Sequence, residues 1–499
     1  MTSTTTRPYA EARETHAAVV LLVGDRAYKV KKPVDLGFLD FTTVAARERA
    51  CRREVALNRR LAPDVYLGVA ELHLPDRTRE PVVVMVRMPD ERRLSTLVRH
   101  RAAVDADLRE LARRLATFHA RSPRGPEIDV EGGIDRLRAR WTDSFRQVDA
   151  FHGTVVDQAE AVDIERLTLR FLDGRGPLFG ARVADGCIVD GHGDLIAEDV
   201  FCLEDGPRAL DCLEFDDRLR YLDRVDDAAF LAVDLEGLDA GELGARFLGW
   251  YTEFAGDVAP PSLLHHYLAY RAFVRVKVAC LRHDQGDPSA GGEARRLTSV
   301  TLRHLTDAAV TLTLVGGLPG TGKSTLAGAI ADRFGMVVLT TDRVRKELAG
   351  LDATAPAASG YRQGIYTPGW TERTYAEVLH RADVLLGRGE SVVVDASWTL
   401  AAHRTAAREL ARRTSSDLVE ISCRAPTPVA AARMAARSGP SDADPAVAAA
   451  LARDASRWPE AVCVDTGGSR EAALLDAAAL FGRSRQPARW RVRSPIEPD

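Results

Sequence analysis

The sequence predicts an α+β domain followed by an α/β domain with a parallel sheet, and three observations lead to this fold class. The chain has 499 residues, which is too long for one hydrophobic core. In the first half, short strand-like runs precede longer helical patterns. In the last third, an apolar run, a glycine-rich loop and a helical pattern follow one another directly, as in the repeating unit of an α/β fold.

The boundary between the two domains is expected near residue 307. Residues 284–292 are rich in Gly, Asp and Pro and predict a loop, and the helical stretch 293–309 leads from it into the apolar run. A polar, proline-containing tail at the end of the chain is expected to be poorly ordered. The predicted parts are therefore a first domain, a second domain and a tail, at 1–306, 307–483 and 484–499.

Composition and charge indicate a soluble, cytoplasmic protein. The formal net charge is −4, which gives no general electrostatic reason to expect a nucleic-acid partner. No apolar run approaches the roughly 20 residues that span a bilayer, and residues 1–13 lack the apolar core of a signal peptide. The seven cysteines include no C-x-x-C pair and are odd in number, which favours reduced thiols over disulfides or a zinc site.

The first domain is expected to begin with a hairpin that carries a lysine cluster. The run 17–23 predicts a strand, Gly24–Asp25 a hairpin turn and 28–32 a second strand. Of the 68 lysines and arginines in the chain, six are lysines, and three of these lie in the second strand. Lys29 and Lys31 share one side of that strand because side chains alternate. Further along, the pattern predicts two helices and one buried strand, at 44–61, 105–120 and 82–86.

A group of acids in the middle of the chain suits phosphoryl transfer. The segment Asp190-Gly191-His192-Gly193-Asp194 is followed by Asp199, and Asp211 lies twelve residues further on. In such reactions one carboxylate accepts the proton of the attacking hydroxyl, while others hold Mg²⁺ against the phosphates. His192 is interpreted as a structural residue of this loop.

Residues 15–282 resemble the aminoglycoside phosphotransferase-like kinases, which have the two-lobed fold of protein kinases. The resemblance implies that Asp194 is the catalytic base, that Asp199 and Asp211 bind the metal, and that Glu54 pairs with the nucleotide-binding lysine. That lysine is one of Lys29, Lys31 and Lys32; if the Gly24–Asp25 turn joins the second and third strands of the family's sheet, it is Lys29. The sequence differs from the family in having Asp199 where Asn is usual and in lacking a G-x-G-x-x-G loop before the lysines.

The glycine-rich segment of the second domain matches a phosphate-binding loop. From Gly317 to Ser324 it fits G-x-x-x-x-G-K-[ST], between the apolar run 310–315 and a helical pattern. Backbone N–H groups and the helix N-terminus would bind the phosphates, Lys323 would reach the β/γ oxygens, and the Ser324 hydroxyl would bind Mg²⁺. The residues predicted to bind nucleotide here are Gly317, Leu318, Pro319, Gly320, Thr321, Gly322, Lys323, Ser324 and Thr325.

Two acids follow apolar runs in this domain. Asp342 ends one run and Asp395 ends another, which places both at the carboxyl edge of a parallel sheet, where ligands bind. Asp342 could orient a substrate hydroxyl or support Mg²⁺ through a water molecule, and Asp395 resembles the acidic metal-supporting position of such folds. Arg433 and Arg437 lie four residues apart and share one helix face, where two guanidinium groups suit the phosphate oxygens of a transition state.

Residues 310–482 resemble small P-loop kinases of the gluconate kinase, polynucleotide kinase and zeta-toxin type, through the glycine loop, Thr341-Asp342-Arg343, Asp395 and the Arg433/Arg437 pair. The resemblance implies that Asp342 activates the acceptor hydroxyl. In this order, the two halves resemble a bifunctional family of aminoglycoside phosphotransferase-like and ATP-binding proteins. We therefore expect ATP and Mg²⁺ as cofactors and the hydroxyl of a small molecule (a sugar, an aminoglycoside-like or a nucleoside-like compound) as acceptor.

Two alternative functions remain open. A regulatory ATPase would combine a catalytically degenerate first domain with a nucleotide-switched second domain, and Asp199 and the missing glycine loop favour it. A nucleic-acid end kinase is suggested by the polynucleotide-kinase resemblance, but the acidic net charge is evidence against it. The identity of the acceptors and the oligomeric state are left open by the sequence.

Overall fold

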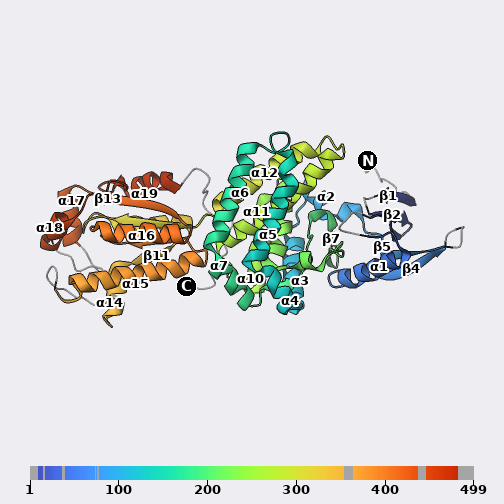
Figure 1. Cartoon of the computed structure of the whole chain (residues 1–499), viewed down its shortest axis with the longest axis horizontal. Coiled ribbons are helices and arrows are strands. Elements are labelled where there is room, and N and C mark those ends of the chain that lie inside the picture. Colours follow the sequence, from blue (N-terminus) through green and yellow to red (C-terminus); the bar gives the residue numbers. More distant parts are fainter. Residues whose placement is uncertain are drawn as a thin grey trace. The chain divides into compact units, whose positions relative to one another are not determined.

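The computed structural model describes residues 9–14, 17–35, 40–73, 75, 78–352, 363–436 and 445–481. The chain divides into two compact units, neither of which is continuous in sequence (Figure 1). Of the described residues, the first unit contains those up to Leu137 together with Arg182–Ala259, and the second contains Arg138–Ala181 and those that follow Ala259. No helix formed by the described residues combines the length and apolar character needed to cross a bilayer.

The first unit begins with a five-stranded antiparallel sheet in the order β1-β2-β3-β5-β4. The helix α1 (Val44–Asn58) packs on it, and Thr43 caps the helix by accepting a hydrogen bond from the Ala46 N–H. The Gly24–Asp25 turn joins the second and third strands, β2 and β3. The strands are β1 (Ala10–Glu14), β2 (Ala18–Val23), β3 (Arg26–Lys31), β4 (Tyr66–His73) and β5 (Arg79–Val86).

Two strands of this sheet were not predicted from the sequence. The edge strand β1 reads Ala-Glu-Ala-Arg-Glu, so its pattern has no large apolar residue to signal a strand. The strand β4 exposes most of its residues and contains a bulge between Tyr66 and Gly68, which interrupts the alternation that would reveal it. Both pair with strands that carry the apolar core.

A mainly helical part with two short antiparallel ladders completes the first unit. The sheet and its one long helix form one lobe, and this helical part forms the other. This is the two-lobed arrangement of protein kinases, which confirms the predicted fold class. The ladders pair β6 with β9 and β7 with β8. The elements are α2 (Leu94–Arg99), α3 (Asp105–Arg121), α4 (Pro126–Asp129), β6 (Ile188–Asp190), β7 (Val200–Leu203), β8 (Gly206–Ala209), α8 (Asp217–Arg220), β9 (Tyr221–Asp223), α9 (Arg224–Gly237) and α10 (Gly241–Ala255), with α7 (Gly176–Ala184) at the junction of the two units.

The second unit contains a parallel five-stranded sheet in the order β11-β12-β10-β13-β14. This confirms the predicted α/β class. The strands are β10 (Thr311–Gly316), β11 (Val337–Thr340), β12 (Val392–Asp395), β13 (Asp417–Arg424) and β14 (Val462–Asp465). The helices of this unit are α5 (Ile134–Val148), α6 (Gln158–Gly174), α11 (Pro261–Asp284), α12 (Ala290–Asp307), α13 (Lys323–Phe334), α14 (Thr341–Leu348), α15 (Pro368–Gly387), α16 (Ala401–Arg413), α17 (Thr427–Ala435), α18 (Pro445–Asp454) and α19 (Arg470–Ala478).

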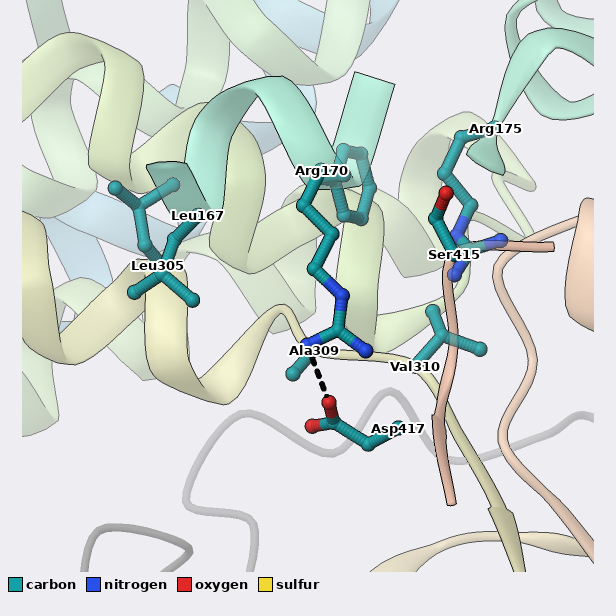
Figure 2. Close-up of a pocket in the computed structure, with 9 residues that line it drawn as sticks. Leu167, Arg170, Arg175, Leu305, Ala309, Val310, Ser415 and Asp417 are labelled. Carbon is teal, nitrogen blue, oxygen red and sulfur yellow. Dashed lines mark ion pairs between the residues drawn. The ribbon is translucent and has the colours of Figure 1, made fainter. Parts of the chain in front are cut away.

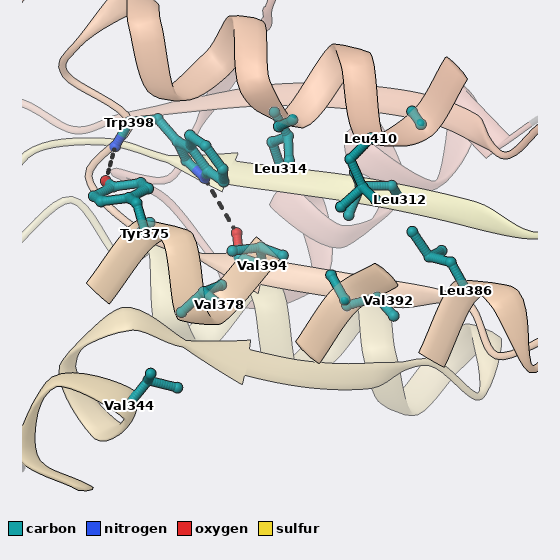
Figure 3. Close-up of a cluster of buried hydrophobic side chains, with 14 of the residues drawn as sticks. Leu312, Leu314, Val344, Tyr375, Val378, Leu386, Val392, Val394, Trp398 and Leu410 are labelled. Carbon is teal, nitrogen blue, oxygen red and sulfur yellow. Dashed lines mark hydrogen bonds between the residues drawn. The ribbon is translucent and has the colours of Figure 1, made fainter. Parts of the chain in front are cut away.

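Apolar side chains cover both faces of this parallel sheet. On one face, the buried residues of β10 and β12 pack against α15 and α16, with Trp398 and Tyr375 at one end (Figure 3). The Trp398 backbone N–H donates to the Tyr375 hydroxyl oxygen at 3.2 Å, and the indole N–H donates to the Val394 carbonyl at 3.3 Å. On the other face, the core is formed largely by α13 and α19. Burial on both faces explains why β12 reads as an unbroken run of valines before Asp395.

The end of α6 packs tightly within the second unit. A Cβ on Gly174 would lie 2.2 Å from the Thr414 carbonyl oxygen, so a side chain cannot be accommodated there. The buried Arg175 guanidinium donates to the carbonyls of Leu386 and Thr414, at 2.8 and 2.9 Å. These carbonyls lie at the C-terminal ends of α15 and α16, where a positive charge is favourable. Nearby, Arg170 and Asp417 form an ion pair of 2.6 Å (Figure 2).

Candidate active sites

Two lysines of β3 and three acids meet in the first unit. The Lys29 ammonium lies 2.9 Å from Glu54 Oε1 and 2.7 Å from Asp211 Oδ1. The Lys31 ammonium lies 2.8 Å from Glu54 Oε2 and 2.7 Å from Glu214 Oε1. Glu54, on α1, is fully buried, and the two lysines provide the positive charge that compensates its carboxylate. Lys29 therefore joins α1 to a predicted metal ligand, while Lys31 joins α1 to Glu214.

The electrostatics of this group follow from its pairing. Burial lowers the pKa of Lys29, but the charges of Asp211 and Glu54 outweigh it and raise that pKa well above the ordinary value. In turn, the positive charge of Lys29 lowers the pKa of Asp211 despite burial. Asp211 has a left-handed backbone with φ of +61°, a conformation that an aspartate adopts at a cost.

The other two predicted acids lie in the loop between β6 and β7. Asp194 directly follows His192-Gly193, and Asp199 ends a short 3₁₀ turn, with its carbonyl accepting a hydrogen bond from the Leu210 N–H at 2.9 Å. Burial raises the pKa of Asp199, and the negative charges of Asp211 and Asp194 raise it further. Three carboxylates that repel one another in this way fit a divalent cation, because a bound cation would relieve the repulsion.

A buried aspartate that the sequence analysis missed holds this loop in place. Asp227, on α9, accepts hydrogen bonds from the backbone N–H groups of His192 and Gly193, at 2.7 and 2.8 Å. His119, on α3, lies 2.9 Å from the same carboxylate and 2.8 Å from the Tyr251 hydroxyl. Burial raises the pKa of Asp227, but the His119 hydrogen bond and charge outweigh it and hold the pKa below its usual range. One signal was present in the sequence: an aspartate among the apolar residues of a helix that is buried almost throughout.

In the second unit, the glycine-rich segment forms a tight loop between β10 and α13. Gly320 and Gly322 have left-handed φ values of +82° and +83°. A Cβ on Gly317 would lie 2.6 Å from Thr321 Oγ1, and one on Gly320 would clash with the Ala430 carbonyl. These positions thus require glycine. Lys323 begins α13, and Ser324 and Thr325 are exposed at the helix N-terminus, where N–H groups and the helix dipole favour an anion.

The two predicted acids of this unit lie at the carboxyl edge of the sheet. Asp395 is buried at the end of β12 and is paired in register with Val315 of β10 and Thr340 of β11. Asp342 lies in the first turn of α14, directly after β11, and is half-buried. The structure therefore places both acids on the edge of the sheet that also carries the phosphate-binding loop.

Arg433 lies over this loop. Its Nη2 donates to the Thr466 carbonyl at 2.8 Å, and its buried Nη1 has no hydrogen-bond acceptor in the part of the chain that the structure describes. Nη1 also lies 3.3 Å from the position that a Cβ on Gly322 would occupy. A buried guanidinium donor next to the loop fits an anionic ligand. Its predicted partner, Arg437, lies outside the described residues.

Arg345 is a further candidate residue that was not predicted from the sequence. Its side chain is buried on α14, and its guanidinium donates to the Ile365 carbonyl at 2.9 Å and lies over the Tyr366 ring. Burial lowers the pKa of Arg345, and the charge of Asp342 opposes this effect. Its buried Nε has no hydrogen-bond partner among the described residues. Arg345 therefore lies close enough to Asp342 for their opposite charges to interact near the edge of the sheet.

Comparisons with known proteins give one matching family model and several similar sequences. A family model described as an AAA domain matches residues 312–461. Curated proteins of Mycobacterium tuberculosis (strain ATCC 25618 / H37Rv) and Mycobacterium bovis (strain ATCC BAA-935 / AF2122/97), each described as uncharacterized, are 45% identical over 479 residues, 96% of this chain and 96% of each relative.

Solved structures with a similar fold match different parts of the chain. A choline/ethanolamine kinase family protein from Mesorhizobium loti is 15% identical and covers 61% of this chain and 94% of its own, with a TM-score of 0.37. A gluconokinase from Sinorhizobium meliloti 1021 is 22% identical and covers 35% of this chain and 93% of its own, with a TM-score of 0.25.

Proposed function

The chain belongs to the same family as these mycobacterial proteins, and we propose that it is an ATP-dependent phosphotransferase with two separate sites, each acting on a small-molecule hydroxyl. The observation that supports the proposal is that each unit contains its own set of candidate phosphate-binding residues together with acidic residues. The first unit has Lys29, Asp211 and the loop of Asp194, and the second has the Gly317–Ser324 loop and Asp342.

In the first unit, Lys29 would bind the α- and β-phosphates of ATP. Asp199 and Asp211 would hold Mg²⁺, which supplies positive charge to the phosphates. Asp194 would accept the proton of the acceptor hydroxyl while the hydroxyl oxygen attacks the γ-phosphorus. The bond between the γ-phosphorus and the oxygen of the β-phosphate would break in the same step. Asp227 would keep the backbone of this loop in position through its two hydrogen bonds.

In the second unit, the loop N–H groups and Lys323 would bind the phosphates, and Ser324 and Asp395 would support Mg²⁺. Asp342 would accept the proton of the second acceptor hydroxyl. Arg433, together with Arg437, would neutralise charge on the transferred phosphoryl group. Arg345 would bind an acceptor oxygen beside Asp342, because its Nε is a buried donor with no partner among the described residues.

The test of this proposal is phosphoryl transfer from labelled ATP to fractionated polar metabolites by the purified full-length protein with Mg²⁺. We expect a phosphorylated small molecule whose formation requires the protein and matches ATP consumption. ATP hydrolysis without any phosphorylated product would contradict the proposal and favour a regulatory ATPase. A labelled oligonucleotide end, formed in preference to any small-molecule product, would favour a nucleic-acid kinase instead.

The regulatory ATPase is retained as a second candidate because of two features of the first unit. Asp199 adds a third negative charge at the predicted metal site, and its pKa is raised by burial and by its acidic neighbours. The short connection between β1 and β2, residues 15–17, contains no glycine. This candidate requires that the first unit binds Mg·ATP without transferring phosphate to any acceptor.

The two lysines of β3 are expected to respond differently to substitution. In a Lys323→Ala background, Lys29→Met should weaken Mg·ATP binding to the first unit by about 1.5–3 kcal/mol, roughly 10- to 100-fold in Kd, because a charged contact to phosphate is lost. Lys31→Met should mainly lower the free energy of unfolding, by about 3–5 kcal/mol, because it leaves the carboxylates of Glu54 and Glu214 short of a buried partner.

Calorimetric titration and denaturant unfolding would measure the two effects. Lys32→Met is the matched control, since Lys32 pairs with the exposed Glu14, and it should change stability by less than about 1 kcal/mol. A loss of ATP binding in Lys31→Met that equals the loss in Lys29→Met, at unchanged stability, would show that the nucleotide role had been assigned to the wrong lysine.

A further inference from the structure

Two histidines that are 39 residues apart in sequence meet inside the second unit. His265 lies near the start of α11 and His304 in the last turn of α12, and their Nδ1 atoms are 2.9 Å apart. His304 is fully buried and His265 nearly so. Asp307, three residues after His304 on the same helix, offers a carboxylate oxygen, and the three ligand atoms all lie within 4.8 Å of one another.

We propose that His265, His304 and Asp307 form a binding site for a divalent transition-metal ion, with Zn²⁺ as the fitting occupant. None of these three residues belongs to the two proposed phosphotransfer sites. Two imidazole nitrogens and one carboxylate oxygen are a donor set that suits zinc and similar ions, whereas Mg²⁺ and Ca²⁺ prefer oxygen ligands throughout. The spacing of these residues in the chain does not predict the site, because the antiparallel packing of α11 on α12 brings the donors together.

The geometry is compatible with a shared ion. Two donors that each bind zinc at about 2.1 Å can be no more than about 4.2 Å apart. The pair of Nδ1 atoms, at 2.9 Å, already satisfies this limit. Asp307 is half-buried, and its ligand oxygen lies within 4.8 Å of the other two ligand atoms, close to this limit. One coordination position would remain for water.

Such an ion would have a defined structural effect. It would tie the start of α11 to the end of α12, and α12 leads through Ala308–Val310 directly into β10, the strand that carries the phosphate-binding loop. Binding to the folded protein in preference to the unfolded chain stabilises the folded state. Without a metal, the same 2.9 Å contact is a hydrogen bond between the two imidazole rings, so a metal-binding measurement distinguishes the two arrangements.

The test uses untagged full-length protein that has been treated with a chelator and dialysed into excess Mg²⁺, which occupies the acidic sites. Elemental analysis after addition of Zn²⁺ should give one zinc per chain, Co²⁺ should give the visible absorption of an ion with nitrogen ligands, and zinc should raise the thermal unfolding temperature. Replacing one of the three ligand residues should weaken zinc binding by more than 10- to 100-fold, which is the loss typical for a residue that only hydrogen-bonds to a metal ligand.

Asp307→Asn is the principal variant, because Asp307 is partly exposed and its replacement should preserve folding; His304→Gln is the second. His380→Gln, at an exposed histidine of α15, is the control for nonspecific binding to imidazoles. Stoichiometric zinc that is lost in Asp307→Asn and kept in His380→Gln would support the site. Absence of stoichiometric zinc in the unaltered protein, or equal zinc affinity in Asp307→Asn and His380→Gln, would overturn it.

Discussion

Replacing Lys323 with alanine is expected to remove phosphoryl transfer at the second unit, with kcat/KM falling by at least about 10²–10³-fold, the cost of losing one preorganised charged donor. Lys323 begins α13 directly after Gly322, so its side chain starts at the loop that would surround the phosphates. Since the first unit has its own lysine, Lys29, paired with Asp211 at 2.7 Å, its reaction should continue at the unaltered rate.

Asp194→Asn is the reciprocal variant and serves as the matched control. It should lower transfer at the first unit by about 10²–10⁴-fold, as expected when a general base is removed, and leave the reaction of the second unit intact. The two products would be followed separately by mass spectrometry, and thermal unfolding would verify that both variants fold. If either substitution abolished both products, the two sites would not be separate, and the proposal of two independent reactions would fail.

Asp227→Asn is expected to lower the free energy of unfolding by about 3–5 kcal/mol, as when one partner of a buried charge network is removed. The carboxylate accepts two backbone N–H groups and also faces His119, and an amide provides one acceptor oxygen in place of two. The rate of phosphoryl transfer at the first unit should fall as well, because the backbone next to Asp194 loses one of the two hydrogen-bond acceptors that hold it in position. Denaturant unfolding and the rate of the first reaction would measure both effects.

A double-mutant cycle with His119→Asn provides the control. Because His119 and Asp227 contact each other at 2.9 Å, the combined variant should be less destabilised than the sum of the two single variants. Additive effects, or a first-unit reaction that is unchanged in Asp227→Asn, would show that Asp227 does not position the loop.

The parts of the molecule that sequence predicted well are local. The phosphate-binding loop is specified within eight residues, from Gly317 to Ser324, and its flanking strand and helix lie on either side. The same holds for the Gly24–Asp25 turn, which joins two apolar strands. In each case, the residues that determine the structure are neighbours in the chain, so their spacing is sufficient.

The parts that were not predicted depend on contacts over long sequence distances. Asp227 supports the loop of Asp194 from a helix more than thirty residues away, and His265 meets His304 across two helices. Lys31 forms a second ion pair with Glu54 that strand periodicity alone could not distinguish from the pair of Lys29. Sequence spacing contains no information about such pairs until the fold is known.

The hydrogen bonds of Arg175 to the ends of α15 and α16 connect distant parts of the sequence. Arg175 and Gly174 come from the first half of the chain, yet they pack against carbonyls of the phosphate-loop half. A recombination event that joined residues 1–306 to a different phosphate-loop domain would deprive this guanidinium of the Leu386 and Thr414 carbonyls. The two halves are therefore expected to be inherited together, and exchange of one half between lineages should be selected against.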